Sequence, residues 1–220
     1  MDRLELKKTA FRDNIISQNK DFLQDKIFIE FGVMDGDSII DFYNLYQKYQ
    51  IQDGGFIGLD SFYGLPEEKI DLYSPWKTSK FTCNGKISKQ LLDNNDIDVI
   101  AGEFKDTLND SLVKKLKDKK IGIVHIDCDI YSSTLSVLDF MVKNGLFCEG
   151  QILIYDDWGC YLMNRDTISD EYMLGEARAH KEIVDKYKLD FNLVCKEVID
   201  PSFYVIAVFK FNSNKLETKC

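Results

Sequence analysis

Two pairs of aspartates follow two short apolar segments and could do chemistry together. Asp127 and Asp129 follow the segment IGIVHI, and Asp156 and Asp157 follow QILIY. If the segments are neighbouring parallel strands, the carboxylates meet at one sheet edge and repel, unless their pKa values rise or a cation binds between them. Carboxylate oxygens without nearby Cys or paired His favour Mg²⁺, with Ca²⁺ or Mn²⁺ as alternatives.

The spacing of one pair suggests a division of labour. Asp127 and Asp129 lie on the same face of a strand, because side chains alternate between faces. One acid could therefore bind the metal while its neighbour acts as a base. Alternatively, Asp129 caps the helix that follows.

A glycine-containing turn follows an earlier apolar segment, KIFIEF. Its pattern is Glu30-x-Gly32-x-x-x-Gly36, and the glycines permit a tight turn and close backbone approach of a ligand. Asp35 and Asp37 in this turn would repel a pyrophosphate, and the absence of a GK[ST] sequence excludes a P-loop. A nucleoside that carries a cationic amine would suit Glu30, although any strand–turn–helix junction also needs glycines.

Other candidate ligands stand after further apolar segments. Asp60 lies 24 residues after Gly36 and could accept hydrogen bonds from both hydroxyls of a ribose, or simply cap a loop. Phe62 could lie against a purine or sugar, or belong to the core. His125 should share the face of Asp127, where it could orient a carboxylate or be a core histidine. His180 is expected to be exposed on a helix.

These residues require an alternating α/β architecture. The patterns predict parallel strands, helices on both faces and right-handed crossovers, in one domain over residues 1–220. The expected strands are 26–31, 55–60, 97–100, 121–126 and 151–155, followed by an antiparallel pair, 191–195 and 203–209, with a turn near 200–201. The expected helices are 38–49, 87–93, 106–117, 132–143 and 175–187.

Composition excludes several classes of protein. The chain has 28 Lys+Arg against 37 Asp+Glu, a net charge of −9, which argues against nucleic acid as a partner and against a polybasic protein that binds membrane surfaces. No apolar stretch approaches the length of a signal peptide or of a membrane span, so we expect a cytoplasmic protein. No two of the six cysteines are closer than twelve residues, which predicts reduced thiols without a CxxC site.

The ordered series of motifs resembles a known family. FIEFGVMDGDSI resembles the first motif of class I S-adenosylmethionine-dependent methyltransferases. GLDSFYGLPE, AGEFKDTL, HIDCDIYSSTLSVL and ILIYDDWG are similar to successive motifs of the macrocin O-methyltransferase (TylF/MycF/NovP) family, over about residues 27–187. The resemblance implies a Rossmann-like seven-stranded sheet, mostly parallel with a C-terminal antiparallel hairpin, and methylation of sugar hydroxyls for natural products or surface glycans.

The same resemblance implies roles for individual residues. Those expected to bind S-adenosylmethionine are Glu30, Gly32, Gly36, Ser38, Asp60, Ser61, Phe62, Gly102, Glu103 and Asp127. Asp127, Asp156 and Asp157 match metal ligands for Mg²⁺ or another divalent cation. Asp129 and Asp127 are the expected catalytic residues, and Asp129 matches the general base. We expect the metal to activate an acceptor hydroxyl, Asp129 to take its proton, and the oxygen to attack the sulfonium methyl.

The acceptor is less defined by the resemblance. The N-terminal segment, residues 1–26, is shorter than is usual in the family, and residues 61–86 and 158–173 could replace a lid, with Trp76, Trp158, Tyr161 and Arg165 available for an acceptor. A sugar or nucleotide-linked sugar is the expected acceptor, and a homo-oligomer is expected. The alternatives are a catechol-type O-methyltransferase, a metal-dependent hydrolase that uses the same acids, and a non-catalytic nucleotide-binding protein.

Overall fold

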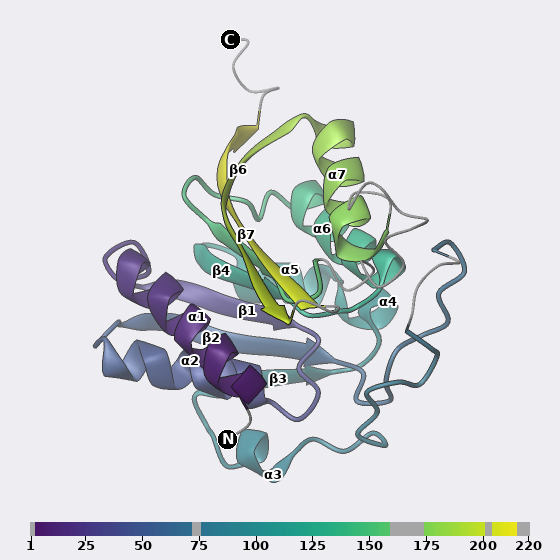
Figure 1. The fold of residues 1–220 in the computed structure, drawn as a ribbon, viewed down its shortest axis with the longest axis horizontal. Coiled ribbons are helices and arrows are strands. Elements are labelled where there is room, and N and C mark those ends of the chain that lie inside the picture. Colours follow the sequence, from purple (N-terminus) through teal and green to yellow (C-terminus); the bar gives the residue numbers. More distant parts are fainter. Residues whose placement is uncertain (1–2, 72–75, 159–173, 201–203, 215–220) are drawn as a thin grey trace.

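Seven strands form a single twisted sheet in the computed structural model, which describes residues 3–71, 76–158, 174–200 and 204–214 (Figure 1). The strand order is β3-β2-β1-β4-β5-β7-β6. The first five strands pair in parallel, and β7 pairs antiparallel with both β5 and β6. The predicted mostly parallel sheet with a C-terminal antiparallel hairpin is therefore confirmed.

The bounds of the first five strands and of most helices agree closely with the predicted segments, whereas the two C-terminal strands are longer than predicted. The strands are β1 (Lys26–Phe31), β2 (Asp53–Asp60), β3 (Ile97–Ala101), β4 (Ile121–Ile126), β5 (Ile152–Tyr155), β6 (Leu189–Asp200) and β7 (Tyr204–Asn214). The helices are α1 (Arg3–Asn19), α2 (Asp37–Lys48), α3 (Lys89–Leu92), α4 (Phe104–Thr107), α5 (Asp110–Leu116), α6 (Tyr131–Lys143) and α7 (Gly175–Tyr187).

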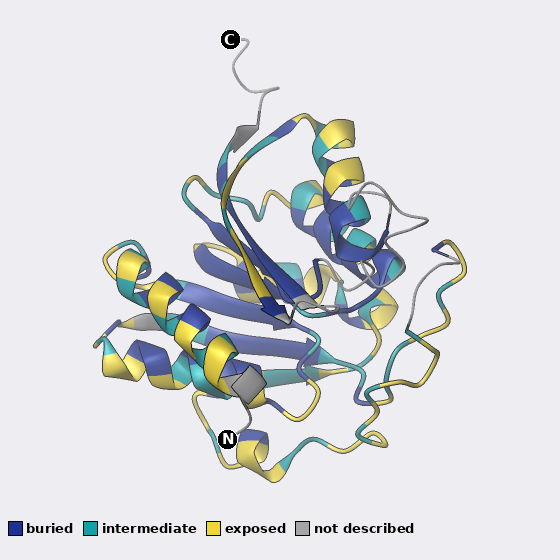
Figure 2. Cartoon of the chain, in the orientation of Figure 1, coloured by how far each residue is buried: buried dark blue, intermediate teal, exposed yellow. Residues whose placement is uncertain are grey.

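Helices cover both faces of the sheet, and each face has its own apolar core. On one face α1, α2 and α3 pack against residues such as Phe28 and Ile123. On the other face α5, α6 and α7 pack against residues such as Ile29 and Val124. All six residues of β4 are buried, as expected for a central parallel strand (Figure 2).

Two local features differ from the prediction. The N-terminal segment, for which no element was predicted, forms α1, and α1 packs on α2 and β6. The single helix predicted over 106–117 is instead two helices, α4 and α5. The break occurs because the side chain of Asn109 accepts hydrogen bonds from the backbone N–H groups of Ser111 and Leu112 and so starts a new helix.

The cysteines that the structure describes, Cys83, Cys128, Cys148 and Cys195, are free, as predicted. Cys160 and Cys220 lie outside the described residues. None of the helices in the described part of the chain is long and apolar enough to cross a membrane.

Candidate active site

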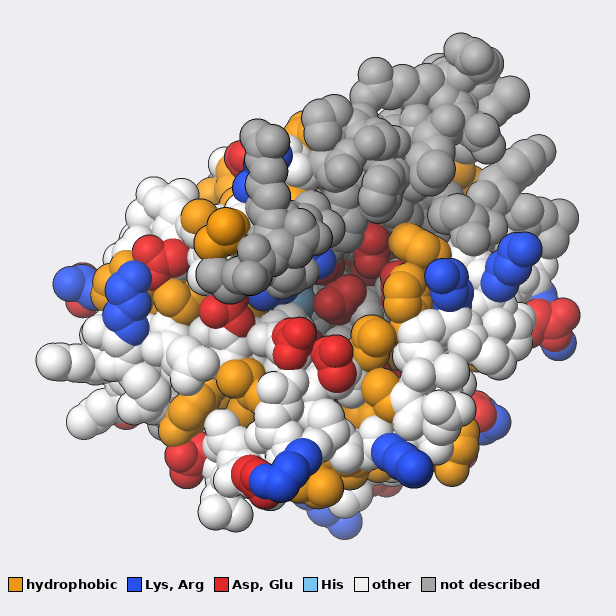
Figure 3. Space-filling model, turned by 60° about the horizontal axis from the view of Figure 1, so that its bottom comes forward, with side chains coloured by type: hydrophobic (Ala, Val, Ile, Leu, Met, Phe, Trp, Pro, Cys, Tyr) orange, Lys and Arg blue, Asp and Glu red, His pale blue; other side chains and the backbone are white. Residues whose placement is uncertain are grey.

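A pocket of about 680 Å³ opens at the carboxyl edge of the parallel strands, where ligands bind in open α/β sheets. Its volume falls within the range of about 300–1,000 Å³ that is typical of small-molecule sites. Acidic side chains gather around this hollow (Figure 3). The acids that line it are Asp60, Glu103, Asp127, Asp129, Asp156 and Asp157. The pairs predicted to converge therefore do so.

The glycine turn after β1 is held against its neighbouring strands. A Cβ atom at Gly32, where φ is 90°, would lie 1.9 Å from the carbonyl oxygen of Asp127, so only glycine fits. The Oδ2 atom of Asp60 accepts hydrogen bonds from the N–H groups of Val33 and Met34, both at 2.8 Å. Its Oδ1 accepts from the N–H of Phe62 at 2.6 Å. Asp60 thus shapes the turn that a cofactor would contact.

The residues predicted to bind a cofactor divide into two groups. Gly32, Asp60, Ser61, Gly102, Glu103 and Asp127 line the pocket. Glu30, Gly36, Ser38 and Phe62 lie outside its lining. Phe62 is only 1% exposed and belongs to the core, whereas the adjacent Tyr63 lines the pocket. Glu30 is fully buried and accepts a hydrogen bond from the Ser38 hydroxyl at 2.5 Å.

A buried chain of charges connects Glu30 to the second aspartate pair. His125 places Nδ1 3.1 Å from Glu30 Oε2 and Nε2 3.5 Å from Asp156 Oδ1. Lys8 from α1 lies 3.1 Å from Asp156 Oδ2. Burial lowers the pKa of His125, but Glu30 and Asp156 outweigh it and raise the pKa to about 9. His125 is therefore an imidazolium at neutral pH and orients two carboxylates, one of the two roles that the sequence left open.

Three of the four aspartates that follow β4 and β5 have raised pKa values. Burial and the charge of Asp156 raise the pKa of Asp127 well above its ordinary value. Burial and the charges of Asp157 and Asp127 do the same for Asp129, which shares a hydrogen bond with Asp157. Burial and Asp156 raise the pKa of Asp157 to about 7. For Asp156, His125 and Lys8 outweigh burial and lower the pKa.

Comparisons with known proteins identify the family. A model of the macrocin O-methyltransferase (TylF) family matches residues 12–186. This chain belongs to the macrocin O-methyltransferase family. It is accordingly an S-adenosylmethionine-dependent O-methyltransferase. A comparison with curated proteins gives no match.

Solved structures of O-methyltransferases share the fold. The calicheamicin methyltransferase CalS11 is similar with a TM-score of 0.71 and 16% identity, over 97% of this chain and 82% of that chain. The O-methyltransferase NovP is similar with a TM-score of 0.64 and 16% identity, over 94% of this chain and 80% of that chain. An O-methyltransferase from Bacillus cereus, in complex with S-adenosylhomocysteine (SAH), is similar with a TM-score of 0.52 and 14% identity, over 93% of this chain and 80% of that chain.

The acid cluster of this methyltransferase suits a hard cation. Among the described residues, six buried or nearly buried acids, Glu30, Asp127, Asp129, Asp156, Asp157 and Glu176, surround the cationic groups of Lys8, Arg12 and His125. Carboxylates therefore exceed cations. Glu176 Oε2 accepts a hydrogen bond from the N–H of Asp157 at 3.1 Å, and its buried Oε1 has no hydrogen-bond partner within the described ranges of the chain. An excess of carboxylate oxygens with one unpaired is the donor set that Mg²⁺ or Ca²⁺ prefers.

The closest set of three metal-ligand atoms is not the predicted trio. In the described part of the chain, ligand atoms of Glu30, His125 and Asp127 lie within 4.8 Å of one another. We interpret this set as an ion-pair network, because His125 lies between the carboxylates of Glu30 and Asp156. Asp127, Asp156 and Asp157 lie in the same pocket and stay the predicted ligands.

Two carboxylates attach the loop after β2 to the helices beside the pocket. Glu68 Oε2 accepts a hydrogen bond from the N–H of Ser132 at the start of α6, at 2.8 Å. Buried Asp71 accepts one from the N–H of Gly175 at the start of α7, at 2.9 Å. Other described residues of the predicted acceptor loop, among them Tyr63, Leu65 and Trp76, line the pocket.

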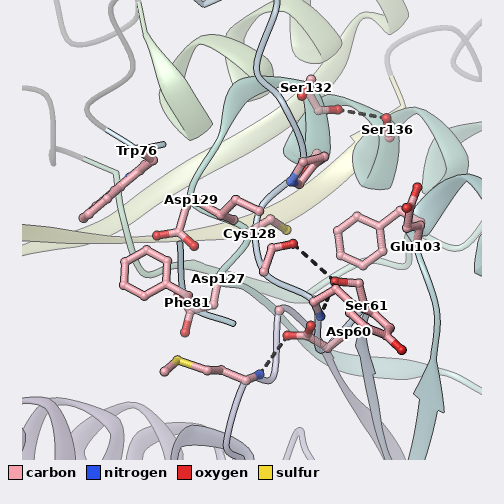
Figure 4. A pocket seen from close by; sticks show the side chains of 18 of the residues that line it. Asp60, Ser61, Trp76, Phe81, Glu103, Asp127, Cys128, Asp129, Ser132 and Ser136 are labelled. Atoms are coloured by element: carbon pink, nitrogen blue, oxygen red, sulfur yellow. Dashed lines mark hydrogen bonds between the residues drawn. The ribbon is translucent and has the colours of Figure 1, made fainter. Parts of the chain in front are cut away.

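Aromatic and hydroxyl side chains also line the pocket. Trp76 and Phe81 contact each other edge to face, with ring centroids 5.1 Å apart. Figure 4 shows Asp129 on their side of the cavity, with Asp60, Ser61 and Glu103 together on the other side. Tyr63, Phe104, Ser132, Ser133 and Ser136 also line the pocket.

Trp158, at the start of the second predicted lid segment, lies in the core. It is 1% exposed and packs with Tyr155, His180 and Phe209. The expectation that His180 is exposed is wrong, because its ring lies in this cluster and its Nδ1 is 2.8 Å from the Tyr155 hydroxyl. Tyr161 and Arg165 lie outside the described residues.

Sequence reasoning missed Lys8, Arg12 and Glu176. The signal for the first two is their spacing, because residues four apart share one face of a helix. Arg12 is 4% exposed, and its guanidinium lies 3.2 Å from Asp41. Glu176 lies in the first turn of α7, and nothing in the neighbouring sequence indicated that it would join the acid cluster.

Proposed function

We propose that this methyltransferase moves the methyl group of S-adenosylmethionine to a hydroxyl of a sugar, with the help of a divalent cation. The supporting observation is the position of Asp129 in a pocket it shares with Asp127, Asp156 and Asp157. A general base must lie within reach of the proton that it removes, and a raised pKa suits a base that works near neutral pH.

Each group of residues has one task in this proposal. The strand ends with Gly32, Asp60 and Gly102 would hold the cofactor, whose sulfonium supplies the methyl group. Asp127, Asp156 and Asp157 would hold the cation, which lowers the pKa of a neighbouring hydroxyl when it is bound. Asp129 accepts the acceptor's proton. The aromatic and serine side chains opposite would orient the sugar, because in-line transfer depends on positioning.

A nucleotide-linked sugar is the first acceptor to test. One solved structure with a similar fold is described as a TDP-rhamnose 3′-O-methyltransferase, at 17% identity and a TM-score of 0.58. Membership of the macrocin O-methyltransferase family favours methyl transfer over the hydrolase and the non-catalytic binding protein. A catechol-type acceptor is the main enzymatic alternative.

The test is a cofactor-consumption assay on the full chain. The panel contains nucleotide-linked sugars, free sugars and catechols, each with Mg²⁺ and with EDTA. We expect SAH to form with a nucleotide-linked sugar in Mg²⁺ only. Turnover of catechols alone would contradict the sugar acceptor, and undiminished turnover in EDTA would contradict the metal.

Three further expectations from the sequence accompany this proposal. We propose that residues 1–220 act as one domain, that the enzyme works in the cytoplasm and that it assembles as a homo-oligomer. Analytical ultracentrifugation of the full chain tests the last of these, and a single species with the 25.5 kDa mass of one chain would contradict it.

A further inference from the structure

Helix α1 carries a lysine into the acid cluster. The side chain of Lys8 is 14% exposed and lines the pocket with Asp127 and Asp157. Its direction is set by the helix, because Phe11, Ile15 and Ile16 are buried in the core between α1 and the sheet. The Lys8 ammonium is therefore held at the site by a docked helix.

Polar contacts on both sides of Lys8 fix α1 in this position. Arg12 forms an ion pair with Asp41 of α2 at 3.2 Å, and Thr9 donates a hydrogen bond to the same carboxylate. Lys7 donates a hydrogen bond to the backbone carbonyl of Ile199 in β6 at 2.8 Å. Two neighbouring lysines thus end on different partners, one on a buried carboxylate and the other on a neutral carbonyl.

Both oxygens of Asp156 face cationic groups of the chain. Lys8 lies 3.1 Å from Oδ2, and His125 lies 3.5 Å from Oδ1. A divalent cation takes carboxylate oxygens at about 2.0–2.6 Å. A dication bound to Asp156 would then lie close to the Lys8 ammonium, and like charges repel strongly where the side chains are largely buried.

We propose that Lys8 is a tethered cation that competes with the divalent metal for Asp156. The inference rests on the metal site of the proposed function. Coupling between two sites is reciprocal, so docking of Lys8 weakens metal binding by the same factor by which the metal weakens the docking of Lys8. Helix α1 thereby sets the metal affinity of the enzyme, and the metal gains its third carboxylate only when Lys8 withdraws.

The test compares Mn²⁺ binding to the full chain and to variants of adjacent lysines. Calorimetry and the electron paramagnetic resonance signal of free Mn²⁺ each give the dissociation constant without substrate. Lys8→Met should bind Mn²⁺ about 5-fold more tightly or better, the lower end of typical coupling between sites. Lys7→Met removes the same charge one residue away and should bind like the wild type. Lys8→Arg keeps the cation and should also resemble the wild type.

Each outcome decides the inference. Equal or weaker Mn²⁺ binding by Lys8→Met would overturn it and leave the metal site standing. A lack of binding by every protein would overturn both the inference and the metal dependence in the proposed function. An equal gain in Lys7→Met would assign the effect to net charge and would also overturn it. Lys8→Gln is the second variant, in case the thioether does not pack, and circular dichroism confirms that each protein is folded.

Discussion

Asp60 shows that one carboxylate can organise a turn before it contacts any ligand. Its oxygens accept three backbone hydrogen bonds, from Val33, Met34 and Phe62. The sequence predicted an acid at the end of this strand that binds a ribose. The structure adds that the same acid holds the turn after β1, so its loss should affect both folding and cofactor binding.

We expect Asp60→Asn to destabilise the protein by about 1–3 kcal/mol, because an amide cannot satisfy three donors as a carboxylate does. It should also weaken SAH binding. Urea unfolding and calorimetry measure the two effects, and Asp93→Asn, at an exposed acid, is the control. Weakened binding with unchanged stability would show that Asp60 acts on the cofactor alone.

Asp129 is the residue for which the proposal makes the sharpest kinetic prediction. A positioned general base contributes about 10²- to 10⁴-fold to a rate. We therefore expect Asp129→Asn to lower kcat at least about 100-fold, with SAH affinity within a factor of about two. Asp106→Asn, at an exposed acid on α4, should leave both values unchanged. A normal kcat for Asp129→Asn would remove Asp129 from the mechanism.

Some residue positions could not be predicted because the decisive partners lie far away in the sequence. Phe62 and Tyr63 are adjacent aromatics, and only the left-handed backbone at Phe62, with φ of 59°, turns one into the core and the other into the pocket. Lys8 meets Asp156 across 148 residues. No local pattern contains such information.

At the scale of elements, the strands and most helices could be predicted, and α1 could not. Buried parallel strands are continuous apolar segments such as IGIVHI, which are recognisable without their neighbours. The buried face of α1 instead includes Lys8 and Arg12, where a helix pattern calls for apolar residues. These charges are tolerated because Asp156 and Asp41 of other elements neutralise them.

The contact between the loop after β2 and α6 depends on one carboxylate. Burial raises the pKa of Glu68, but the N–H groups of Ser132, Ile70 and Asp71 outweigh it and lower the pKa below its ordinary value. This contribution to stability is present above the ordinary carboxyl pKa of about 4.5 and is lost as the pH falls through the lowered value.

We therefore expect Glu68→Gln to destabilise the protein by about 1 kcal/mol at pH 7, since the site is partly exposed. The difference from the wild type should shrink below about pH 4. KM for the acceptor should rise while SAH affinity stays constant, because we propose that this loop contacts the acceptor. Glu67→Gln, on the exposed neighbour, is the matched control. A stability difference that persists in acid would contradict the pKa argument.

On the scale of the whole molecule, the structure shows where part of the net charge of −9 lies. Part of the acidic excess is concentrated in one buried cluster, so the stability of the protein should depend on pH and on cations together. Burial raises the pKa values of Asp127, Asp129 and Glu176 well above their ordinary values, and that of Asp157 to about 7.

The sign of the pH dependence follows from these shifts. A carboxyl group whose pKa is raised by folding binds more protons in the native state, so its contribution to stability is greatest in acid; for Asp157 it declines as the pH rises from the ordinary value of 3.8 to about 7. The imidazolium of His125, with a pKa of about 9, adds stability below its ordinary pKa of 6.5 that is lost as the pH rises through 9. Together they lower the stability of the metal-free protein as the pH rises from 5.5 to 8, with Asp157 acting up to about pH 7 and His125 acting above pH 6.5.

Metal ligands must be ionised, so the metal should oppose this decline. At about 100 times its dissociation constant a ligand adds about 2.7 kcal/mol, or roughly 5–10 °C in Tm for a chain of this length. We expect the Tm increase from Mg²⁺ to be near this value at pH 8 and to shrink at pH 5.5, where protons compete for the same carboxylates. Thermal unfolding at both pH values, with Asp157→Asn as the variant that lacks one ligand, measures it. An equal increase at both pH values would place the cation outside the buried cluster.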